Sequence, residues 1–309
     1  MRAAVAAEFN GIESVRVGDA PTPVPKDGQV LVRVRAAGVG RWDVGMLAGG
    51  FPGLATPFIP GQEVAGVVAD VGSGVDVERG DRVYGTLFPS GGGFAEWAVV
   101  DAARLAVMPD RLDFPEAAGL VIAAGTAHEG LVDRGGLKAG QTVLVTAAAG
   151  GVGGAAVQIA AALGARVLGV ASARNHDYVR SLGASYVFDY HDAGWPQQVL
   201  AAEPGGVDLL LDCAGGQTRD QAITAVRDGG RAGFIVIQDA EPELPRGITA
   251  DSFAARVTRS RLQALSALVE AGSLRANIAE VMPLDRARDA LAQVASRHTR
   301  GKIVIQVEP

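Results

Sequence analysis

The sequence is poor in the residue types that form disulfides and metal centres. Of its 309 residues, one is cysteine and four are histidine. A single cysteine, Cys213, excludes an intrachain disulfide and a four-cysteine zinc site. We interpret Cys213 as a small apolar residue at a strand end, with a reactive thiol as the alternative. The histidines are too scattered for ligand spacing, so the sequence predicts no metal site: His128, His176, His191 and His298.

Long apolar runs and a strong excess of one charge are also missing. No run of about 18 apolar residues, the length of a membrane-spanning helix, is present. The N-terminus reaches a charged residue too early for a secretory signal. Twenty-eight basic and 34 acidic residues give a net charge of −6, which argues against binding to nucleic acid or polyanionic membranes. We therefore expect a cytoplasmic protein of two domains that binds neither.

Glycine, in contrast, is abundant, with 42 residues, and part of it forms a motif within residues 142–174. An apolar run at 142–146 predicts a strand, residues 155–163 a helix and residues 166–171 a second strand. Between the first strand and the helix the chain reads A-x-G-x-x-G, which in a βαβ unit is a dinucleotide fingerprint. Glycines allow the backbone to approach a pyrophosphate and the helix to pack closely on the strand. The predicted phosphate-binding residues are Ala148, Gly150, Gly151, Val152 and Gly153.

The residues after the second strand bear on the choice of dinucleotide. An NAD site usually carries Asp or Glu there, to bind the ribose 2′-hydroxyl. Residues 171–175 read ASARN and contain no carboxylate. Ser172 can donate a hydrogen bond to a 2′-phosphate, and Arg174 can pair with its charge. The sequence thus favours NADPH, whereas the alternative makes Arg174 a solvated residue at a helix start.

The pattern of the rest of the chain predicts an α/β fold. Residues 1–120 contain short β-like runs separated by Gly and Pro, with one helix at 41–47, and indicate a β-rich domain. Residues 121–274 alternate strands and helices, which indicates a doubly wound parallel sheet. In that region we expect strands at 186–189, 207–212, 231–237 and 253–257, and helices at 175–182, 197–202, 218–226 and 260–271. The tail, 275–309, reads strand, helix, strand at 278–282, 285–295 and 303–307.

Several phrases together carry a family resemblance. They are GQEVAG at 61–66, GDRVYG at 80–85, GFAE at 93–96, the glycine turn, SLGA at 181–184 and RGKIV at 300–304. In this order the chain resembles the medium-chain dehydrogenase/reductase superfamily, and most closely its zinc-less, NADPH-dependent quinone oxidoreductases related to zeta-crystallin. The resemblance implies a GroES-like catalytic domain at 1–120, to which the tail returns, and a Rossmann domain at 121–274. It also implies an active site in the cleft between the domains and a homodimer.

The resemblance also bears on the metal. Zinc members of the superfamily use an early Cys, the His of a Gly-His-Glu phrase, and a Cys or acid near the glycine turn. The corresponding positions here are about Gly38 to Gly40, Gln62 and Ala147, so that only Glu63 could ligate. Without a Lewis acid, the accessible reaction is hydride transfer from NADPH to an already electrophilic acceptor, a quinone or an α,β-unsaturated carbonyl.

The phrase GVGRWD at 38–43 is similar to the family's Gly-Val-Asn-Pro-x-Asp, with Gly40 in place of Asn and Arg41 in place of Pro. Arg41 could clamp a substrate oxyanion or simply be solvated. Trp42 could stack on a flat substrate or belong to the core. Asp43 could form the site wall, relay a proton or cap its helix.

Other candidates follow from the same resemblance. Thr126 matches a threonine beside the nicotinamide, and its alternative is a core position. Tyr84 is either a weak proton donor in the cleft or a packing residue. Tyr178 could lie against the adenine or the 2′-phosphate, or pack on the sheet. The remaining predicted cofactor contacts are Ala214 and, at the end of a strand that pairs across the dimer in relatives, Ile235, Val236 and Ile237.

Three other functions stay open at this point. An enoyl reductase acting on a thioester or a biosynthetic intermediate needs the same hydride geometry. A protein that binds NADPH without turnover is compatible with the loss of the family's Asn at Gly40. A zinc alcohol dehydrogenase would contain stoichiometric zinc, which we do not expect.

Overall fold

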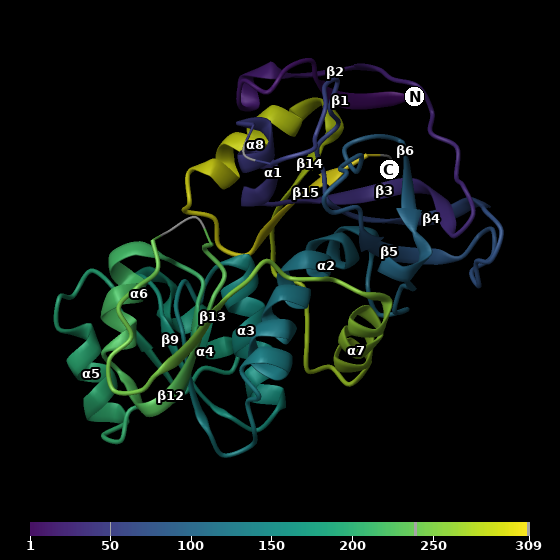
Figure 1. The fold of residues 1–309 in the computed structure, drawn as a ribbon. Coiled ribbons are helices and arrows are strands. Elements are labelled where there is room, and N and C mark those ends of the chain that lie inside the picture. Colours follow the sequence, from purple (N-terminus) through teal and green to yellow (C-terminus); the bar gives the residue numbers. More distant parts are fainter. Residues whose placement is uncertain (50, 238–239, 308–309) are drawn as a thin grey trace. The chain divides into compact units, whose positions relative to one another are not determined.

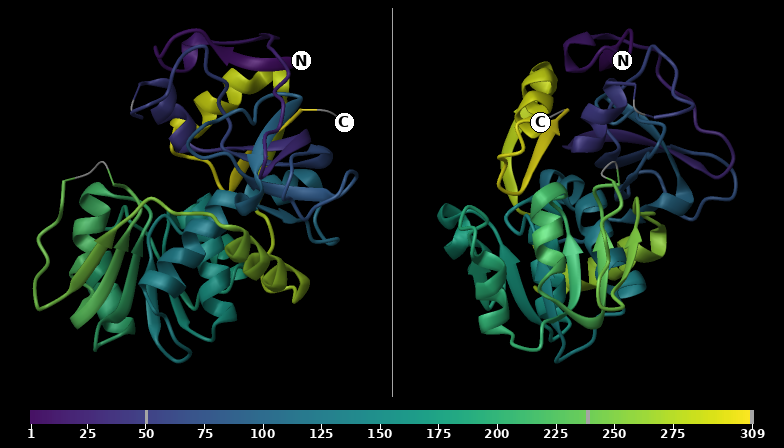
Figure 2. Two further views of the ribbon diagram at one scale, coloured as in Figure 1. Left: turned by 45° about the vertical axis from the view of Figure 1, so that its right-hand side comes forward. Right: turned by 60° about the vertical axis from the view of Figure 1, so that its left-hand side comes forward.

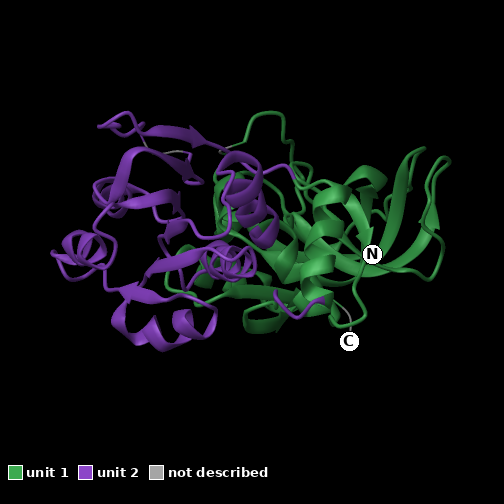
Figure 3. Ribbon diagram, turned by 90° about the horizontal axis from the view of Figure 1, so that it is seen from below, with its two compact units in different colours: residues 1–122, 257–270, 275–309 green, residues 123–256, 271–274 purple. Residues whose placement is uncertain are grey.

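The computed structural model describes residues 1–49, 51–237 and 240–307, and these form two compact units. Unit 1 comprises Met1–Ile122, Val257–Glu270 and Arg275–Pro309 (green in Figure 3). Unit 2 comprises Ala123–Arg256 and Ala271–Leu274 (purple). The division falls within helix α2, Phe114–His128, which a helical segment of π type, Glu129–Arg134, continues.

A seven-stranded sheet, counted over the described residues, is the framework of unit 1. Its order is β14-β15-β3-β4-β5-β7, with β6 also paired to β3. All neighbours are antiparallel except β14 and β15. The strands are β3 Gln29–Val39, β4 Glu63–Val71, β5 Arg82–Thr86, β6 Trp97–Asp101, β7 Leu105–Val107, β14 Ile278–Pro283 and β15 Lys302–Gln306, with a separate pair β1 Arg2–Ala6 and β2 Val15–Asp19.

Alternating side chains explain the longest strand of this sheet. In β3, Val30, Val32 and Val34 are fully buried while Arg33 is exposed, as expected for a strand with one face in the core. The tail of the chain completes the unit. Its helix α8, Ala287–Ala295, lies against α1, Arg41–Leu47, and against β2. In Figure 2 the yellow tail accordingly runs beside the purple and indigo N-terminal segments.

Unit 2 contains a six-stranded sheet, again counted over the described residues, in which every neighbouring pair is parallel. The strands are β8 Thr142–Val145, β9 Arg166–Val170, β10 Tyr186–Phe188, β11 Val207–Asp212, β12 Val226–Phe234 and β13 Thr249–Ser252. The helices are α3 Gly151–Ala162, α4 His176–Ser181, α5 Trp195–Ala202 and α6 Gly216–Ile223 (Figure 1).

The order of this sheet is β10-β9-β8-β11-β12-β13, which is the doubly wound order 3-2-1-4-5-6 of a dinucleotide-binding fold. Its central strands are buried on both faces, and Leu144, Leu168 and Leu210 are each 0% exposed. The order reverses between β8 and β11. The predicted α/β fold, with a β-rich unit and a doubly wound parallel-sheet unit, is therefore confirmed.

Two strand predictions were wrong in detail. Strand β12 begins at Val226 and ends at Phe234, so the predicted end at residues 235–237 lies beyond it; the ladder with β11 stops where Asp212 pairs Phe234. The last strand is not 253–257 but β13, whose residues are all exposed. Phe253 and Val257 are buried, 4% and 6% exposed, and their apolar character misled the prediction.

Helix α7, Arg259–Glu270, was predicted within the Rossmann domain but belongs to unit 1. Its first residue anchors it there: Arg259 donates to the carbonyl oxygens of Ala102 and Leu105 and pairs with Asp76. These partners are more than 150 residues away in sequence, so no local pattern reports them. None of the helices in the described ranges combines the length and apolar composition needed to cross a membrane.

Candidate active site

The glycine turn joins β8 to α3 in unit 2. Ala147 has a positive φ of 47°, and its carbonyl oxygen accepts the N–H of Gly150 at 2.9 Å. A Cβ on Gly153 would lie 2.2 Å from the same oxygen, so only glycine fits there. Ala148, fully buried, occupies the place of the first glycine. The backbone N–H groups at the start of α3, from Gly151 on, have no intrahelical acceptors and can bind an anion.

Two polar side chains hold the neighbouring loop at the point where the strand order reverses. Thr146 Oγ1 donates to Asp212 Oδ1 at 2.6 Å and accepts the N–H of Cys213 at 2.8 Å. The other carboxylate oxygen of Asp212 accepts the N–H of Gly215 at 2.9 Å. Burial raises the pKa of Asp212, and these hydrogen bonds oppose the rise. The loop that carries Ala214 is thus fixed where a dinucleotide binds in this fold.

Sequence reasoning missed Thr146 and Asp212. Their signal was a polar residue at the end of each of two apolar strands, β8 and β11. Ile235 lies beside the end of β11, where its N–H donates to the carbonyl oxygen of Asp212 at 3.2 Å. Ile235 and Val236 are half-buried, and Ile237 is 45% exposed.

The predicted 2′-phosphate site lies after β9. Arg174 is exposed, and Ser172 Oγ accepts a hydrogen bond from Asn175 Nδ2 at 3.2 Å. The prediction that no carboxylate stands there was incomplete. Asp189, from the end of β10, accepts the N–H of Ala173 at 3.1 Å. Hydrogen bonds from His191 lower the pKa of Asp189, so a negative charge adjoins this turn.

The remaining candidates of unit 2 lie on helices. Thr126 is on α2 and 6% exposed, which is compatible with the core position as well as with a contact to cofactor. Tyr178 is half-buried on α4.

In unit 1, Asp43 links the start of α1 to the turn before β4. Its two carboxylate oxygens accept the N–H groups of Gly40 and Gly61, each at 2.9 Å. The side chain is 0% exposed. Burial raises the pKa of Asp43 to about 7, although both hydrogen bonds act in the opposite direction. These contacts support the capping interpretation of Asp43.

A buried ion pair lies beside it. Lys302 Nζ pairs with Glu63 Oε1 and donates to the carbonyl oxygen of Val39 at 2.9 Å. Glu63 Oε2 accepts the N–H of Ile122 at 2.8 Å. Burial raises the pKa of Glu63, and the ion pair with Lys302 counteracts this. The Lys302 ammonium also lies 4.7 Å from the centre of the Trp42 ring, a cation–π distance.

The replacement of the family's Asn by Gly40 has a steric cause. A Cβ at Gly40 would lie 2.0 Å from Cε2 of Trp42, inside the indole. An Asn at position 40 therefore cannot coexist with Trp42 where it stands. The half-buried Trp42 fills that space instead. Arg41, the first residue of α1, is exposed.

The proton-donor interpretation of Tyr84 is corrected by its surroundings. The ring is 1% exposed, and the hydroxyl donates to the carbonyl oxygen of Leu262 at 2.6 Å, with Ser266 Oγ at 2.9 Å. Burial raises the pKa of Tyr84 to about 12. Tyr84 thus fastens α7 to β5, which is the packing alternative.

At the positions of the superfamily's zinc ligands the donors do not form a set. Gly40 has no side chain, Gln62 offers an amide, and Glu63 is engaged by Lys302. Gln62 is 0% exposed, and its backbone carbonyl accepts hydrogen bonds from Thr86 Oγ1 and the N–H of Leu87, both at 2.8 Å. Within the described residues, no group of three or more His, Cys, Asp or Glu could hold a metal ion.

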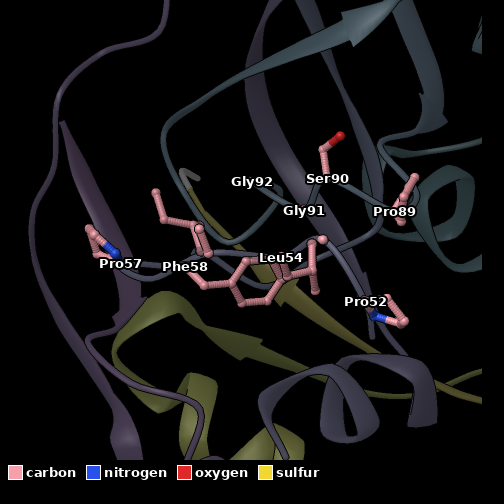
Figure 4. Close-up of a pocket in the computed structure, with 11 residues that line it drawn as sticks. Pro52, Leu54, Pro57, Phe58, Pro89, Ser90, Gly91 and Gly92 are labelled. Atoms are coloured by element: carbon pink, nitrogen blue, oxygen red, sulfur yellow. The ribbon is translucent and has the colours of Figure 1, made fainter. Parts of the chain in front are cut away.

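A cavity of about 460 Å³ opens in unit 1 (Figure 4). Its walls come from two segments, residues 52–59 and 89–92. In the view of Figure 4, the side chains of Leu54 and Phe58 lie between those of Pro52 and Pro57. Glycines bring the two walls together: the N–H of Gly92 donates to the carbonyl oxygen of Ile59 at 2.8 Å. The lining is mainly apolar, and sequence reasoning did not identify it.

Comparison with known proteins covers both units. Residues 26–110 match the alcohol dehydrogenase GroES-like domain family, and residues 182–305 match the zinc-binding dehydrogenase family. An NADPH-dependent alkenal/one oxidoreductase of Arabidopsis thaliana is 31% identical over 100% of this chain and 80% of its own length. A quinone oxidoreductase of Homo sapiens is 31% identical over 94% of this chain and 92% of its own. A polyketide synthase of Streptomyces halstedii is 38% identical over 94% of this chain, which spans only 5% of that protein.

Solved structures of similar proteins superpose on the whole chain. An NAD-dependent alcohol dehydrogenase superposes with a TM-score of 0.93 at 31% identity, over 100% of both chains. A mycobacterial protein solved with NADPH superposes with a TM-score of 0.89 at 27% identity, over 99% of this chain and 100% of its own. With relatives above 30% identity along most of their length, the chain belongs to the medium-chain dehydrogenase/reductase superfamily, whose oxidoreductases bind a nicotinamide cofactor.

Proposed function

We propose that the protein is an NADPH-dependent reductase of quinones or α,β-unsaturated carbonyls that works without a metal. The observation that carries this proposal is the turn at 147–153, where Gly153 admits no Cβ and the start of α3 offers backbone N–H groups. Bound there, NADPH supplies a hydride. Among the relatives, a quinone oxidoreductase and an alkenal/one oxidoreductase bear names of this chemistry.

For the cofactor, we assign the 2′-phosphate to the Ser172 hydroxyl and the Arg174 guanidinium. Arg174 is exposed and has the charge that a phosphate requires, whereas Asp189 acts against it. Arg174→Asp should reduce the ratio of kcat/KM for NADPH to that for NADH by at least about tenfold. Arg180→Asp, an exposed arginine on α4 that pairs with Asp177, is the matched control. An unchanged ratio in Arg174→Asp would remove this assignment.

For the nicotinamide end, we assign the Thr126 hydroxyl to the carboxamide, and Ile235 and Val236 to the ring. The hydrogen bond between Thr146 and Asp212 supports this, since it fixes the loop on which Ile235 is anchored. A Thr126→Val variant, nearly the same shape without the hydroxyl, should raise KM for NADPH. Because Thr126 is 6% exposed, a fall in stability without a change in KM would point to the core interpretation instead.

The proposal of metal independence rests on the residues at the ligand positions. Glu63, the one carboxylate there, is engaged by Lys302, and Gln62 has an amide, a poor zinc ligand. Activity should survive dialysis against a chelator, and metal analysis should find less than about 0.1 zinc per chain. Stoichiometric zinc, with loss of activity on its removal, would establish an alcohol dehydrogenase instead.

For the acceptor, an apolar cavity of about 460 Å³ has room for one ring or a short alkenyl chain. NADPH absorbance is followed against benzoquinone, cyclohexenone and an enoyl thioester, with NADH as the control. Rapid oxidation with benzoquinone or cyclohexenone supports the proposal. Tight NADPH binding without oxidation across the panel would favour the interpretation as a binding protein without turnover.

A second candidate is an enoyl reductase acting on a thioester or another biosynthetic intermediate. The specific observation is the 38% identity to a segment of a polyketide synthase. A preference for the enoyl thioester over cyclohexenone by more than about 100-fold in kcat/KM would establish it.

We also propose a homodimer. The strand predicted to end at residues 235–237 and to pair across the dimer is β12, which lies between β11 and β13 and is not an edge strand. The pairing is therefore proposed through the exposed edge strand β13. Light scattering that shows a monomer at micromolar concentration would exclude this.

A further inference from the structure

Unit 1 contains buried side-chain nitrogen and oxygen atoms that have no hydrogen-bond partner among the described residues. Trp42 Nε1 and Gln62 Oε1 are both buried, and neither bonds to any other described residue. The remaining amide atom of Gln62, Nε2, reaches only Met46 Sδ, at 3.2 Å, and a thioether is a weak acceptor. Native proteins contain few such groups, because an unsatisfied buried donor or acceptor costs stability. A pair of them in one part of the fold therefore requires an explanation.

Asp43 joins the two chain segments that carry these side chains. Its carboxylate bonds the N–H of Gly40, two residues before Trp42, and the N–H of Gly61, directly before Gln62. Trp42 and Met46 are one turn apart on α1 and share a face of that helix. Because the Gln62 amide contacts Met46, it lies on the Trp42 side of α1.

Contacts restrain the indole and the backbone of Gln62. The indole lies so close to Gly40 that a Cβ there would come within 2.0 Å of it, and the Lys302 ammonium lies 4.7 Å from the ring centre. The backbone carbonyl of Gln62 accepts hydrogen bonds from Thr86 Oγ1 in β5 and from the N–H of Leu87, the residue after β5. A donor and an acceptor that lack protein partners in this restrained region are available to a ligand.

We propose that Trp42 and Gln62 form the polar end of the acceptor subsite, where they bind the carbonyl group of the substrate. Trp42 Nε1–H donates to the carbonyl oxygen, and, when the substrate is a quinone, Gln62 Oε1 accepts from the hydroxyl that this oxygen becomes. Phe58 and Ile59, which precede Gln62 by four and three residues, line the cavity, and its mainly apolar side chains suit the carbon skeleton of the same molecule. The assignment rests on the proposed reductase function and names the acceptor class of its site.

The redox step balances with this pair in place. The hydride from NADPH carries two electrons to a quinone, the nicotinamide is oxidised, and one proton from water completes the hydroquinone. Negative charge develops on the carbonyl oxygen before that proton arrives. A fixed N–H donor stabilises this charge more strongly than it binds the uncharged ketone, so its contribution falls mainly on kcat.

The test uses the full-length protein with Trp42→Phe and Gln62→Leu. We expect kcat/KM for benzoquinone to fall about 10- to 100-fold in each, with KM for NADPH unchanged. The loss of kcat/KM should not be accompanied by a loss of thermal stability. Gln62→Leu removes an unsatisfied buried amide, so Tm should rise by about 2–4 °C. Trp97→Phe and Gln158→Leu are the matched controls; the Gln158 amide donates to the carbonyl oxygen of Gly154, so Gln158→Leu should lower Tm and leave kcat/KM unchanged.

A second measurement is independent of turnover. Hydroquinone, which carries the hydroxyl that Gln62 Oε1 would accept, is titrated against tryptophan fluorescence in the absence of NADPH. We expect saturable quenching in the wild type that weakens at least about tenfold in Gln62→Leu, which retains all three tryptophans. If the wild type reduces benzoquinone and both variants stay within about twofold of it, the subsite is refuted and the reductase stands. If no acceptor is reduced but hydroquinone binds in a Gln62-dependent manner, the subsite stands and the reductase function fails. Absence of both signals overturns both.

Discussion

Asp43 makes the stability of the protein depend on pH in a direction opposite to that of an ordinary salt-bridged carboxylate. Burial raises its pKa from 3.8 to about 7. Between these values the folded protein keeps a proton that the unfolded chain releases, so stability falls as pH rises through this window and levels off above it. At about 1.4 kcal/mol per unit of pKa, the full effect is on the order of 4 kcal/mol. About 2–3 kcal/mol of it falls between pH 5 and pH 8.

Asp43→Asn removes this titration and isolates the effect. The amide has one acceptor oxygen for the two N–H groups of Gly40 and Gly61, so the variant should be less stable than the wild type at pH 5 by about 1–3 kcal/mol. Because the wild type alone weakens with pH, that gap should close by about 2–3 kcal/mol, or reverse, by pH 8.

The assay is urea unfolding at pH 5, 6, 7 and 8, followed by tryptophan fluorescence and analysed by linear extrapolation. Asp113→Asn, an exposed carboxylate that also accepts a backbone N–H, corrects for the general loss of one negative charge. A gap between Asp43→Asn and the wild type that stays within about 0.5 kcal/mol across this range would show that Asp43 is ionised throughout, and would refute the reasoning.

Two further predictions test the other interactions of the site. Lys302→Met leaves Glu63 buried without its cation, which should lower the free energy of unfolding by about 3–5 kcal/mol at pH 7. The loss should be smaller at pH 5, because Glu63 then takes up a proton. The double variant with Glu63→Leu should recover most of this loss, as measured by urea titration. Gly153→Ala places a Cβ 2.2 Å from the carbonyl oxygen of Ala147 and should weaken NADPH binding at least about tenfold in a fluorescence titration. Gly45→Ala is the control, because a Cβ there meets nothing within 4 Å and should leave NADPH binding unchanged. Equal NADPH binding by the two variants would contradict the close approach in the turn.

Features that depend on neighbours in sequence could be predicted. The turn of unit 2 is one example, because the strand before it, the glycines within it and the helix after it are contiguous, and each follows from local patterning. The doubly wound parallel sheet followed from alternating strands and helices, whereas its strand order came from the structure. Helix α1 was also predicted with its observed bounds, because Gly40 precedes its first residue and small residues follow its last residue, Leu47.

Features that depend on contacts between residues distant in sequence could not be predicted. Lys302 meets Glu63 across 239 residues, and Tyr84 meets Ser266 across 182. No periodicity reports such contacts, so Glu63 was judged a possible ligand and Tyr84 a possible acid. Asp189 was overlooked for the same reason: it reaches the turn at 172–174 from the neighbouring strand, while the prediction considered only the residues that follow β9 in sequence.

The departure of Gly40 from the family pattern is best understood as one part of a coupled change. A glycine there creates the space that the Trp42 indole fills, and the indole in turn receives the Lys302 ammonium on its face. Loss of the Asn side chain therefore does not leave the site without a polar group, because Trp42 brings an N–H of its own. On this argument Gly40→Asn alone should damage the protein by displacing the indole, rather than restore a function. The polar contact that the family resemblance implies for an Asn at position 40 and the contact proposed for Trp42 exclude each other sterically, so the chain can contain either but not both.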